Sequence, residues 1–356
     1  SRDGSPLKQI LLVLRKTASP AACRSSLPIS WKEKWANFKH TLPHQGQPFA
    51  KRNWGHPLHS LCSYQGKMKP ALAHFLVRIF VPPGGSMLDP FSGVGTIPFE
   101  AALQGTKSFG FEISPSARYI AAAKVGRPDR NKCVEIIQSL KRYMNNANVS
   151  SEELTAAQSF GFNHKLSEFY HPDTLREIIL ARNYFKENEP SNPSECLVIA
   201  ALLHILHGNR PYCLSRRSHP ITPFAPSGAF EYRSLVPHLI EKVNRSLTLE
   251  YPTSFTEGKI FDQDSTSWWP VEVEQLDAIV TSPPFFDSTR FYMANWLRLW
   301  FCGWETKDFI EKPKHFVDEL QKLSFDVYES IFRQARERLK EDGVIVLHLG
   351  ASKKCN

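Results

Sequence analysis

Apolar runs and helical patterns alternate in two separate parts of the chain. Five short apolar runs predict strands at residues 86–91, 108–113, 258–261, 276–281 and 344–349. Segments with helical spacing of apolar residues lie at 97–103, 116–125, 291–302 and 324–340. Strands that alternate with helices are typical of an α/β fold with a doubly wound, mostly parallel sheet.

The residues between these two parts show helical patterns without strands. Helices are expected at 133–144, 151–157, 173–185, 194–207 and 235–249, and a loop with four prolines at 208–234. We therefore expect an α/β domain made of residues 58–126 and 256–356, interrupted by a mainly helical insertion at 127–255. The composition of residues 1–57 predicts loops and short helices, or partial disorder. The spacing of apolar residues predicts a helix over 69–80.

The last predicted strand, 344–349, lies seven residues before Asn356. A doubly wound sheet normally continues past its fifth strand. We therefore expect either that the sequence is truncated before the sheet ends, or that the sheet closes by another route.

Basic charge is concentrated near the N-terminus of this chain of 356 residues, whose formal net charge is +9. Residues 1–70 hold 12 Lys and Arg and two acids, which gives +10, whereas the other 286 residues hold 32 basic and 33 acidic side chains. A basic arm at 1–57 suits contact with a polyanion, although a solvated tail has the same composition.

Two other protein classes are disfavoured. No apolar run reaches the ~18 residues that a membrane span needs. The seven cysteines include no Cys-x-x-Cys pair, which argues against a disulfide framework and a zinc ribbon and suits a reducing compartment.

The strongest chemical signal is Leu88–Thr96 (LDPFSGVGT), between a predicted strand and a predicted helix. Gly93 and Gly95 allow the backbone to approach a ligand closely at the helix N-terminus. The third glycine of a dinucleotide motif is missing, and Asp89 stands where it can hold an ammonium group. Glu112 ends the next strand, where a carboxylate can accept both hydroxyls of a ribose. An amino-acid tail and a ribose describe S-adenosylmethionine better than a nicotinamide cofactor.

The second signal is Thr281–Phe286 (TSPPFF), directly after a predicted strand. Pro283 and Pro284 fix the backbone and remove two N–H donors, so the loop offers the Ser282 hydroxyl and the Pro283 carbonyl as acceptors. These two acceptors can hold the exocyclic amine of a planar base while Phe285 stacks on its ring. No strong general base is needed when the methyl donor is already activated, so positioning supplies most of the rate.

These motifs, in this order, resemble the amino-methylating DNA methyltransferases, and most of all the N4-cytosine group, whose catalytic residues are Ser-Pro-Pro-Tyr. The resemblance covers about residues 59–126 and 258–350 and includes segments 63–70, 109–115 and 259–265. It implies a Rossmann-like class I methyltransferase fold and S-adenosylmethionine as the cofactor. The cofactor-binding residues it implies are Tyr64, Lys67, Asp89, Phe91, Gly93, Gly95, Thr96, Glu112, Ile113 and Asp264. The catalytic residues it implies are Ser282, Pro283, Pro284 and Phe285, the last replacing the usual Tyr.

The resemblance implies transfer of a methyl group to the N4 amine of cytosine in DNA, with the target base flipped out of the helix. Methylation of adenine N6, in DNA or RNA, stays open because both bases present a donor beside an acceptor. A non-catalytic DNA-binding module is the alternative from another class. A 5-methylcytosine mechanism is disfavoured because no cysteine follows a proline. The location would be the nucleoid or cytoplasm of a prokaryote, or the nucleus of a eukaryote.

Basic residues in three places are candidates for DNA contacts. They are Lys51, Arg52, Arg210, Arg216, Arg217, His219 and Arg290. The four from 210–219 lie in the proline-containing loop of the insertion, which makes that region a candidate for target recognition. An exposed basic loop or internal ion pairs would look the same in the sequence. His204 and His207 near Cys213 could bind a metal, but a hydrogen-bonded core pair is favoured, so no metal site is expected.

Overall fold

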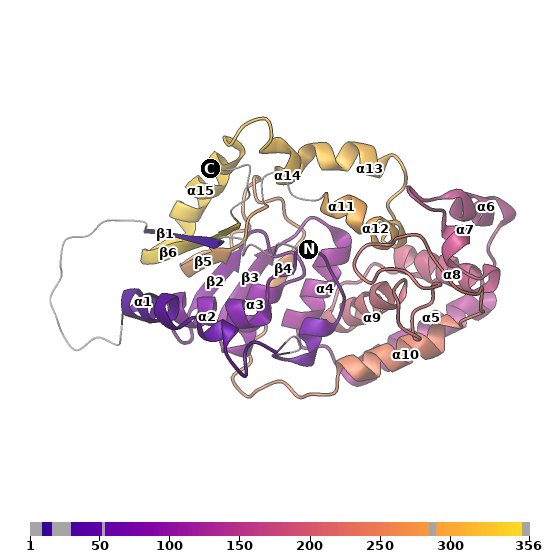
Figure 1. The fold of residues 1–356 in the computed structure, drawn as a ribbon, viewed down its shortest axis with the longest axis horizontal. Coiled ribbons are helices and arrows are strands. Elements are labelled where there is room, and N and C mark those ends of the chain that lie inside the picture. Colours follow the sequence, from indigo (N-terminus) through magenta and orange to yellow (C-terminus); the bar gives the residue numbers. More distant parts are fainter. Residues whose placement is uncertain (1–8, 16–29, 52–53, 285–289, 351–356) are drawn as a thin grey trace, which may run out of the picture.

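The computed structural model describes residues 9–15, 30–51, 54–284 and 290–350. In these residues six strands form one sheet in the order β1-β6-β5-β2-β3-β4 (Figure 1). The strands are β1 (Gln9–Arg15), β2 (Ser86–Asp89), β3 (Lys107–Phe111), β4 (Lys259–Phe261), β5 (Leu276–Thr281) and β6 (Leu339–Gly350). All neighbouring strands are parallel except β1 and β6. This sheet confirms the predicted α/β class.

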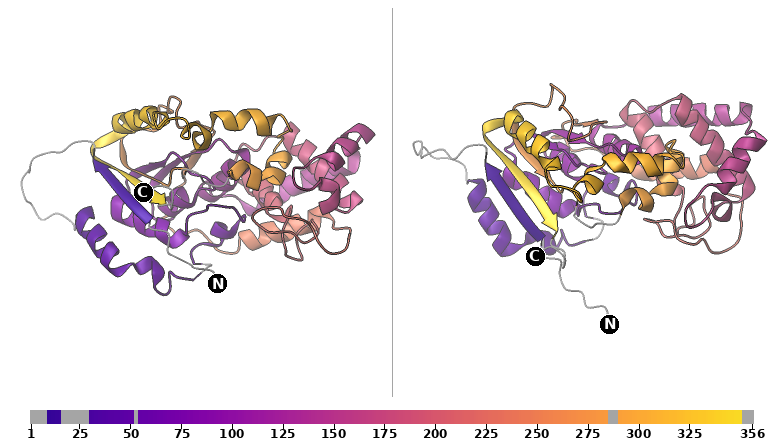
Figure 2. Two further views of the ribbon diagram at one scale, coloured as in Figure 1. Left: turned by 45° about the horizontal axis from the view of Figure 1, so that its top comes forward. Right: turned by 90° about the horizontal axis from the view of Figure 1, so that it is seen from above.

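The antiparallel edge of the sheet is made by β1, which the sequence did not predict as a strand. It pairs with β6 from Gln9 opposite Gly350 to Arg15 opposite Val344, and the two strands lie side by side in both views of Figure 2. The sheet thus continues beyond the fifth predicted strand, β6, through β1, a segment from the N-terminal part of the sequence. The prediction of only loops and short helices in residues 1–57 was wrong for this segment.

Helices cover both faces of the sheet, and the alternation of side chains along the strands explains how. Met87, Val280 and Val346 point to the face that packs against α1 (Trp31–Thr41), α2 (Pro70–Phe80) and α3 (Thr96–Leu103). Their neighbours Leu88, Ile279 and Ile345 point to the opposite face and pack against α15 (Val327–Arg338). Figure 1 shows these two groups of helices on opposite sides of the strands.

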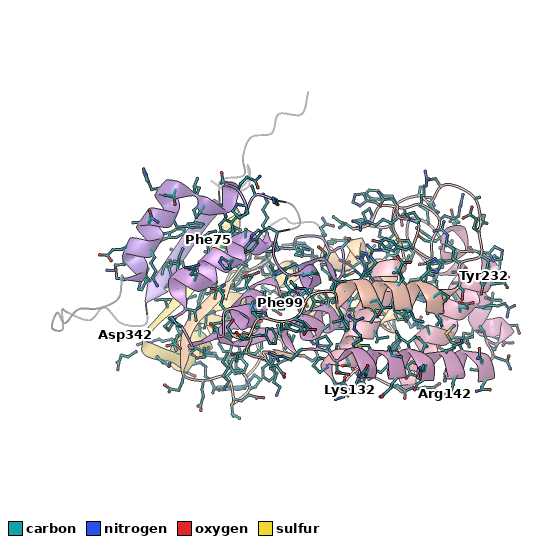
Figure 3. All side chains as sticks on the ribbon, turned by 90° about the horizontal axis from the view of Figure 1, so that it is seen from below. Phe75, Phe99, Lys132, Arg142, Tyr232 and Asp342 are labelled. Atoms are coloured by element: carbon teal, nitrogen blue, oxygen red, sulfur yellow. The ribbon has the colours of Figure 1, made fainter. Side chains whose placement is uncertain are left out.

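The inserted residues form a helical body at one side of the sheet (Figure 3), where Lys132, Arg142 and Tyr232 lie far from Phe75 and Asp342. Its helices are α5 (Arg130–Asn146), α6 (Ser151–Ser159), α7 (Leu166–Phe169), α8 (Pro172–Glu187), α9 (Pro193–Ile205) and α10 (Leu235–Ser246). The central helix α9 is apolar on all sides and buried from Cys196 to Ile205. It packs against α4 (Pro115–Val125) of the α/β part and shares one core with α12 (Trp296–Phe301).

Two predicted elements after the second motif differ from the structure. The helix expected over 291–302 is broken at Asn295 into α11 (Phe291–Ala294) and α12. The helix expected over 324–340 ends at Arg338, because residues 339–343 already belong to β6, whose register on β5 shifts there. The remaining short helices are η1 (Pro43–Gln45), η2 (Pro57–Ser60), α13 (Asp308–Glu311), η3 (Lys312–His315) and α14 (Val317–Leu320). Within the described ranges, no helix has the length and apolar character needed to cross a membrane.

Candidate cofactor and substrate site

A cavity of about 440 Å³ opens where the carboxyl ends of β2, β3, β4 and β5 meet. In a doubly wound sheet this edge is where ligands bind, because the loops that follow the strands diverge there. Thirteen of the residues predicted for cofactor or substrate line the cavity: Tyr64, Lys67, Asp89, Phe91, Gly93, Thr96, Glu112, Ile113, Asp264, Ser282, Pro283, Pro284 and Arg290. The structure thus brings both sequence motifs to one site. Phe285 lies outside the described residues.

Asp89 is the most deeply placed acid of the cavity, with 2% of its surface exposed. Its Oδ1 accepts a hydrogen bond from the Thr281 hydroxyl at 2.5 Å and one from the Phe91 backbone N–H at 3.1 Å. Burial raises the pKa of Asp89 to about 7, although the two hydrogen bonds lower it. A buried carboxyl without a cationic neighbour in the described residues is suited to a cationic ligand, which would restore its charge.

Glu112 follows β3 and faces the same cavity. Its Oε1 accepts the Ser114 N–H at 2.7 Å, and burial raises its pKa to about 7. Tyr64 lies close to this carboxyl, and burial together with the Glu112 charge raises the pKa of Tyr64 to about 12. The pair therefore presents carboxyl oxygens that can accept hydrogen bonds and a neutral phenol, which matches a ligand that carries hydroxyl groups.

The two glycines of the first motif have different roles. Gly93 has a φ of +50°, and a Cβ placed there would meet nothing within 4 Å, so the cavity is open beside it. Gly95 does not line the cavity; it has a φ of +72°, and a Cβ would lie 2.7 Å from the Ala121 Cβ of α4. It is needed for the turn and for close packing of α3 on α4. The buried Lys124 ammonium fixes this turn by donating to the Val94 carbonyl at 2.6 Å.

Lys67 and Asp264 line the cavity but are partly engaged in the protein. The Lys67 ammonium donates to the His59 carbonyl at 2.5 Å, and burial lowers its pKa. The Asp264 Oδ1 accepts from the backbone N–H and the hydroxyl of Thr266, both at 2.8 Å. Lys67 is therefore held as part of the wall, whereas Asp264 is oriented with one carboxylate oxygen not used in these bonds.

Ser282 is oriented by β6, which the sequence did not indicate. Its hydroxyl donates to the His348 carbonyl at 3.1 Å, and its Oγ lies 3.4 Å from the His348 Nδ1. Since the hydroxyl proton is directed at β6, Oγ keeps a lone pair for a donor in the cavity even when the His348 Nδ1–H donates to it. Burial lowers the pKa of His348, which keeps the ring neutral at pH 7.

Two further acids of the cavity wall, Asp318 and Glu319 of α14, were not predicted. The Asp318 Oδ1 is buried and has no hydrogen-bond partner among the residues described, and burial raises the pKa of this carboxyl. The Glu319 carboxylate lies 3.5 Å from Arg290. Neither acid follows a predicted strand or belongs to a motif, so the sequence carried no signal for them.

The basic residues predicted to touch DNA have different environments. Lys51, Arg210 and Arg217 are exposed, and 61% of the Arg290 side chain is exposed. Arg52 lies outside the described residues.

Two residues of the insertion loop take part in its internal structure. The Arg216 guanidinium donates to the carbonyls of Gly228 (2.8 Å) and Glu168 (3.0 Å), so it supports the loop. His219 is exposed, and its Nδ1 accepts from the backbone N–H groups of Ile221 and Thr222, both at 3.4 Å.

His204 in α9 and His207, two residues after α9, make hydrogen bonds inside the protein. His204 lies 3.2 Å from the Tyr212 hydroxyl and accepts from the Ser63 N–H at 3.3 Å. The His207 Nδ1 lies 3.1 Å from the His219 carbonyl. Burial lowers the pKa of both rings well below its usual range, so both are neutral. The described part of the chain has no group of three or more His, Cys, Asp or Glu side chains placed to bind a metal ion.

The sheet order, with its antiparallel edge and a cavity at the ends of the parallel strands, defines a Rossmann-like methyltransferase fold. Residues 23–123 match the family described as DNA methylase, whose model covers N6 and N4 enzymes. The Type II methyltransferase M.MjaII of Methanocaldococcus jannaschii is 31% identical over 80 residues, which are 22% of this chain and 15% of that protein. No solved structure matches the chain with significance. Both similarities are to DNA methyltransferases, and they do not separate N4 from N6 as the target amine.

Proposed function

We propose that this chain binds S-adenosylmethionine and transfers its methyl group to an exocyclic amine of a base in DNA. The observation that carries the proposal is the meeting of Asp89, Glu112 and Ser282 in one cavity of about 440 Å³. The match to DNA methylases supports the same class of reaction.

The donor groups of the cavity fit this cofactor. Asp89 would hold the ammonium group of the amino-acid tail, and Glu112 would accept the ribose hydroxyls. Asp264 and Ile113 would contact the adenine, since both line the cavity at the ends of β4 and β3. The open space beside Gly93 leaves room for the ligand against the backbone. When bound, the cofactor supplies a methyl group on a positively charged sulfur, which is already activated for transfer.

Ser282 and the two prolines position the target amine. The Ser282 hydroxyl donates to the His348 carbonyl, so its Oγ accepts an N–H of the amine. The Pro283 carbonyl is the second acceptor, and two acceptors favour a more pyramidal nitrogen with an available lone pair. Since no strong base is required, the neutral Ser282 is sufficient for this role.

The finer proposal is that the target is N4 of cytosine in DNA, with the base flipped into the cavity. It rests on the resemblance of Ser282–Pro284 to the N4-cytosine group, in which Ser holds the first position. The exposed residues Lys51, Arg210, Arg217 and Arg290 would contact phosphates around the flipped base.

Mass spectrometry of nucleosides from DNA incubated with the protein and S-adenosylmethionine tests both the class of reaction and the choice of cytosine N4. The expected result is N4-methylcytosine, formed at a much lower rate with Ser282→Ala. N6-methyladenine instead would refute the cytosine assignment and keep the class of reaction. No methylated base, together with failure to bind the cofactor in calorimetry, would favour a non-catalytic DNA-binding module.

A further inference from the structure

The insertion loop carries a tip, residues 218–224, that is closed on itself by hydrogen bonds. The Ser218 hydroxyl donates to the Phe224 carbonyl and also accepts the Phe224 N–H, both at 3.1 Å. The backbone of Ser218 in turn donates to the Gly208 carbonyl at 2.9 Å, at the start of the loop. The tip is therefore a fixed turn in the structure.

The tip is anchored to α12 and to one residue of the cavity wall. Arg298 of α12 is fully buried and donates to the carbonyls of Pro220 (3.0 Å) and Ile221 (3.3 Å). The Thr222 hydroxyl donates to the side-chain carbonyl of Gln65 at 3.3 Å, and Gln65 lines the cavity. These bonds place the tip between segment 63–70, which holds Gln65, and helix α12, which holds Arg298.

Phe224 ends this anchored tip and exposes 55% of its surface. One side of its ring packs against His219, with ring centroids 5.2 Å apart, and the exposed Arg217 lies directly before the tip in the same loop. Phe230 provides a contrast: it is 49% exposed, but the Arg216 guanidinium lies over its ring at 4.3 Å. Of these two exposed phenylalanines, only Phe224 ends a segment that is hydrogen-bonded, through Thr222, to a residue of the cavity wall.

We propose that Phe224 is a wedge that enters the base stack of duplex DNA beside the flipped target base. This inference rests on the proposed function, because it needs a base that leaves the duplex. Flipping costs a few kcal/mol of stacking and pairing, and an apolar ring inserted between bases replaces part of the lost stacking. Because the backbone of the tip is already fixed, little conformational entropy is lost when the ring inserts.

The test compares methylation of native and heat-denatured copies of the same unmethylated DNA. Phe224→Ala is expected to slow methylation of native DNA by about 5- to about 150-fold, the range for loss of one base–aromatic stack. Methylation of denatured DNA, cofactor affinity and the melting temperature are expected to stay at wild-type values. Phe224→Trp keeps a stacking ring and should restore the rate on native DNA.

Phe230→Ala is the matched control, with the same residue type in the same loop and similar exposure, and its rates should not change. The wedge is refuted if Phe224→Ala leaves the native-DNA rate unchanged, or if Phe224→Trp is as slow as Phe224→Ala. An equal loss on native and denatured DNA would refute it too, since it would show a general defect. A wild-type protein that methylates neither substrate contradicts the proposed function itself, which separates that failure from failure of the wedge alone.

Discussion

Cofactor affinity should depend on pH through the two buried carboxyls of the cavity. Burial raises the pKa of both Asp89 and Glu112 to about 7. Between pH 5 and pH 7 the ionised fraction of such a group rises from about 1% to about 50%, while an α-ammonium with a pKa of about 7.7 stays protonated. If Asp89 must be ionised to hold the ammonium, affinity should rise about 50-fold over this range, and more if Glu112 must ionise as well.

The same pKa values predict an opposite trend for the stability of the empty protein. A carboxyl whose pKa is higher in the folded than in the unfolded state holds its proton better when folded, so the free energy of unfolding falls as pH rises from about 4 to about 7. For Asp89, a rise from 3.8 to about 7 corresponds to about 4 kcal/mol, lost in full above pH 7. The ligand should therefore raise the melting temperature most at neutral pH.

Isothermal titration calorimetry with S-adenosylmethionine at pH 5, 6 and 7 measures the effect directly. S-adenosylhomocysteine, which keeps the ammonium and the ribose, should show the same pH dependence. Asp89→Asn should bind more weakly at pH 7 and lose the Asp89 part of the dependence. Equal dissociation constants at pH 5 and pH 7 for the wild type would refute the assignment of these carboxyls as ligand-binding anions.

Three substitutions and one control substitution test other parts of the structure. Ser282→Ala should lower kcat about 10²- to 10³-fold with unchanged cofactor affinity, because one preorganised acceptor is lost; an equal loss of affinity in calorimetry would contradict that role. Gly95→Ala should lower the free energy of unfolding by about 2–4 kcal/mol through its positive φ and its overlap with Ala121, measured by urea unfolding. Gly93→Ala is the matched control and should cost only about 1–2 kcal/mol but weaken cofactor binding; equal destabilisation by both would show that packing on α4 is unimportant. Arg298→Lys should release the loop tip, seen as faster amide exchange at the hydrogen-bonded residues of 208–224, and unchanged exchange there would contradict the anchoring role.

Residues at strand ends could be predicted from the sequence because local patterns place them. Asp89 and Glu112 each directly follow a short apolar run, and parallel strands bring such positions to one edge of the sheet. Ser282 was found for the same reason. Each of these predictions needed only the strand and the residue after it.

Contacts between distant segments could not be predicted in this way. The strand at Gln9–Arg15 is an apolar run whose partner lies more than 300 residues away, and nothing in the run specifies β6. His348 reaches Ser282 only because β5 and β6 are neighbours, and Asp318 enters the cavity from a short helix without a motif. Asp342-Gly343 resembles a turn but lies inside β6, in the stretch where the register of β6 on β5 shifts between Leu339 and Val344.

The pairing of β1 with β6 also has a consequence for how the protein is made. Strand β1 leaves the ribosome before β6, with more than 300 residues between them, so this edge of the sheet forms only after the elements between the two strands are available. Until then Leu12 and its apolar neighbours have an unpaired backbone, which is prone to pair with other chains. Loop closure over such a separation also slows folding. Chaperone dependence and slow acquisition of the β1–β6 pair, measured by pulse-labelled amide exchange, should therefore accompany biosynthesis of this chain.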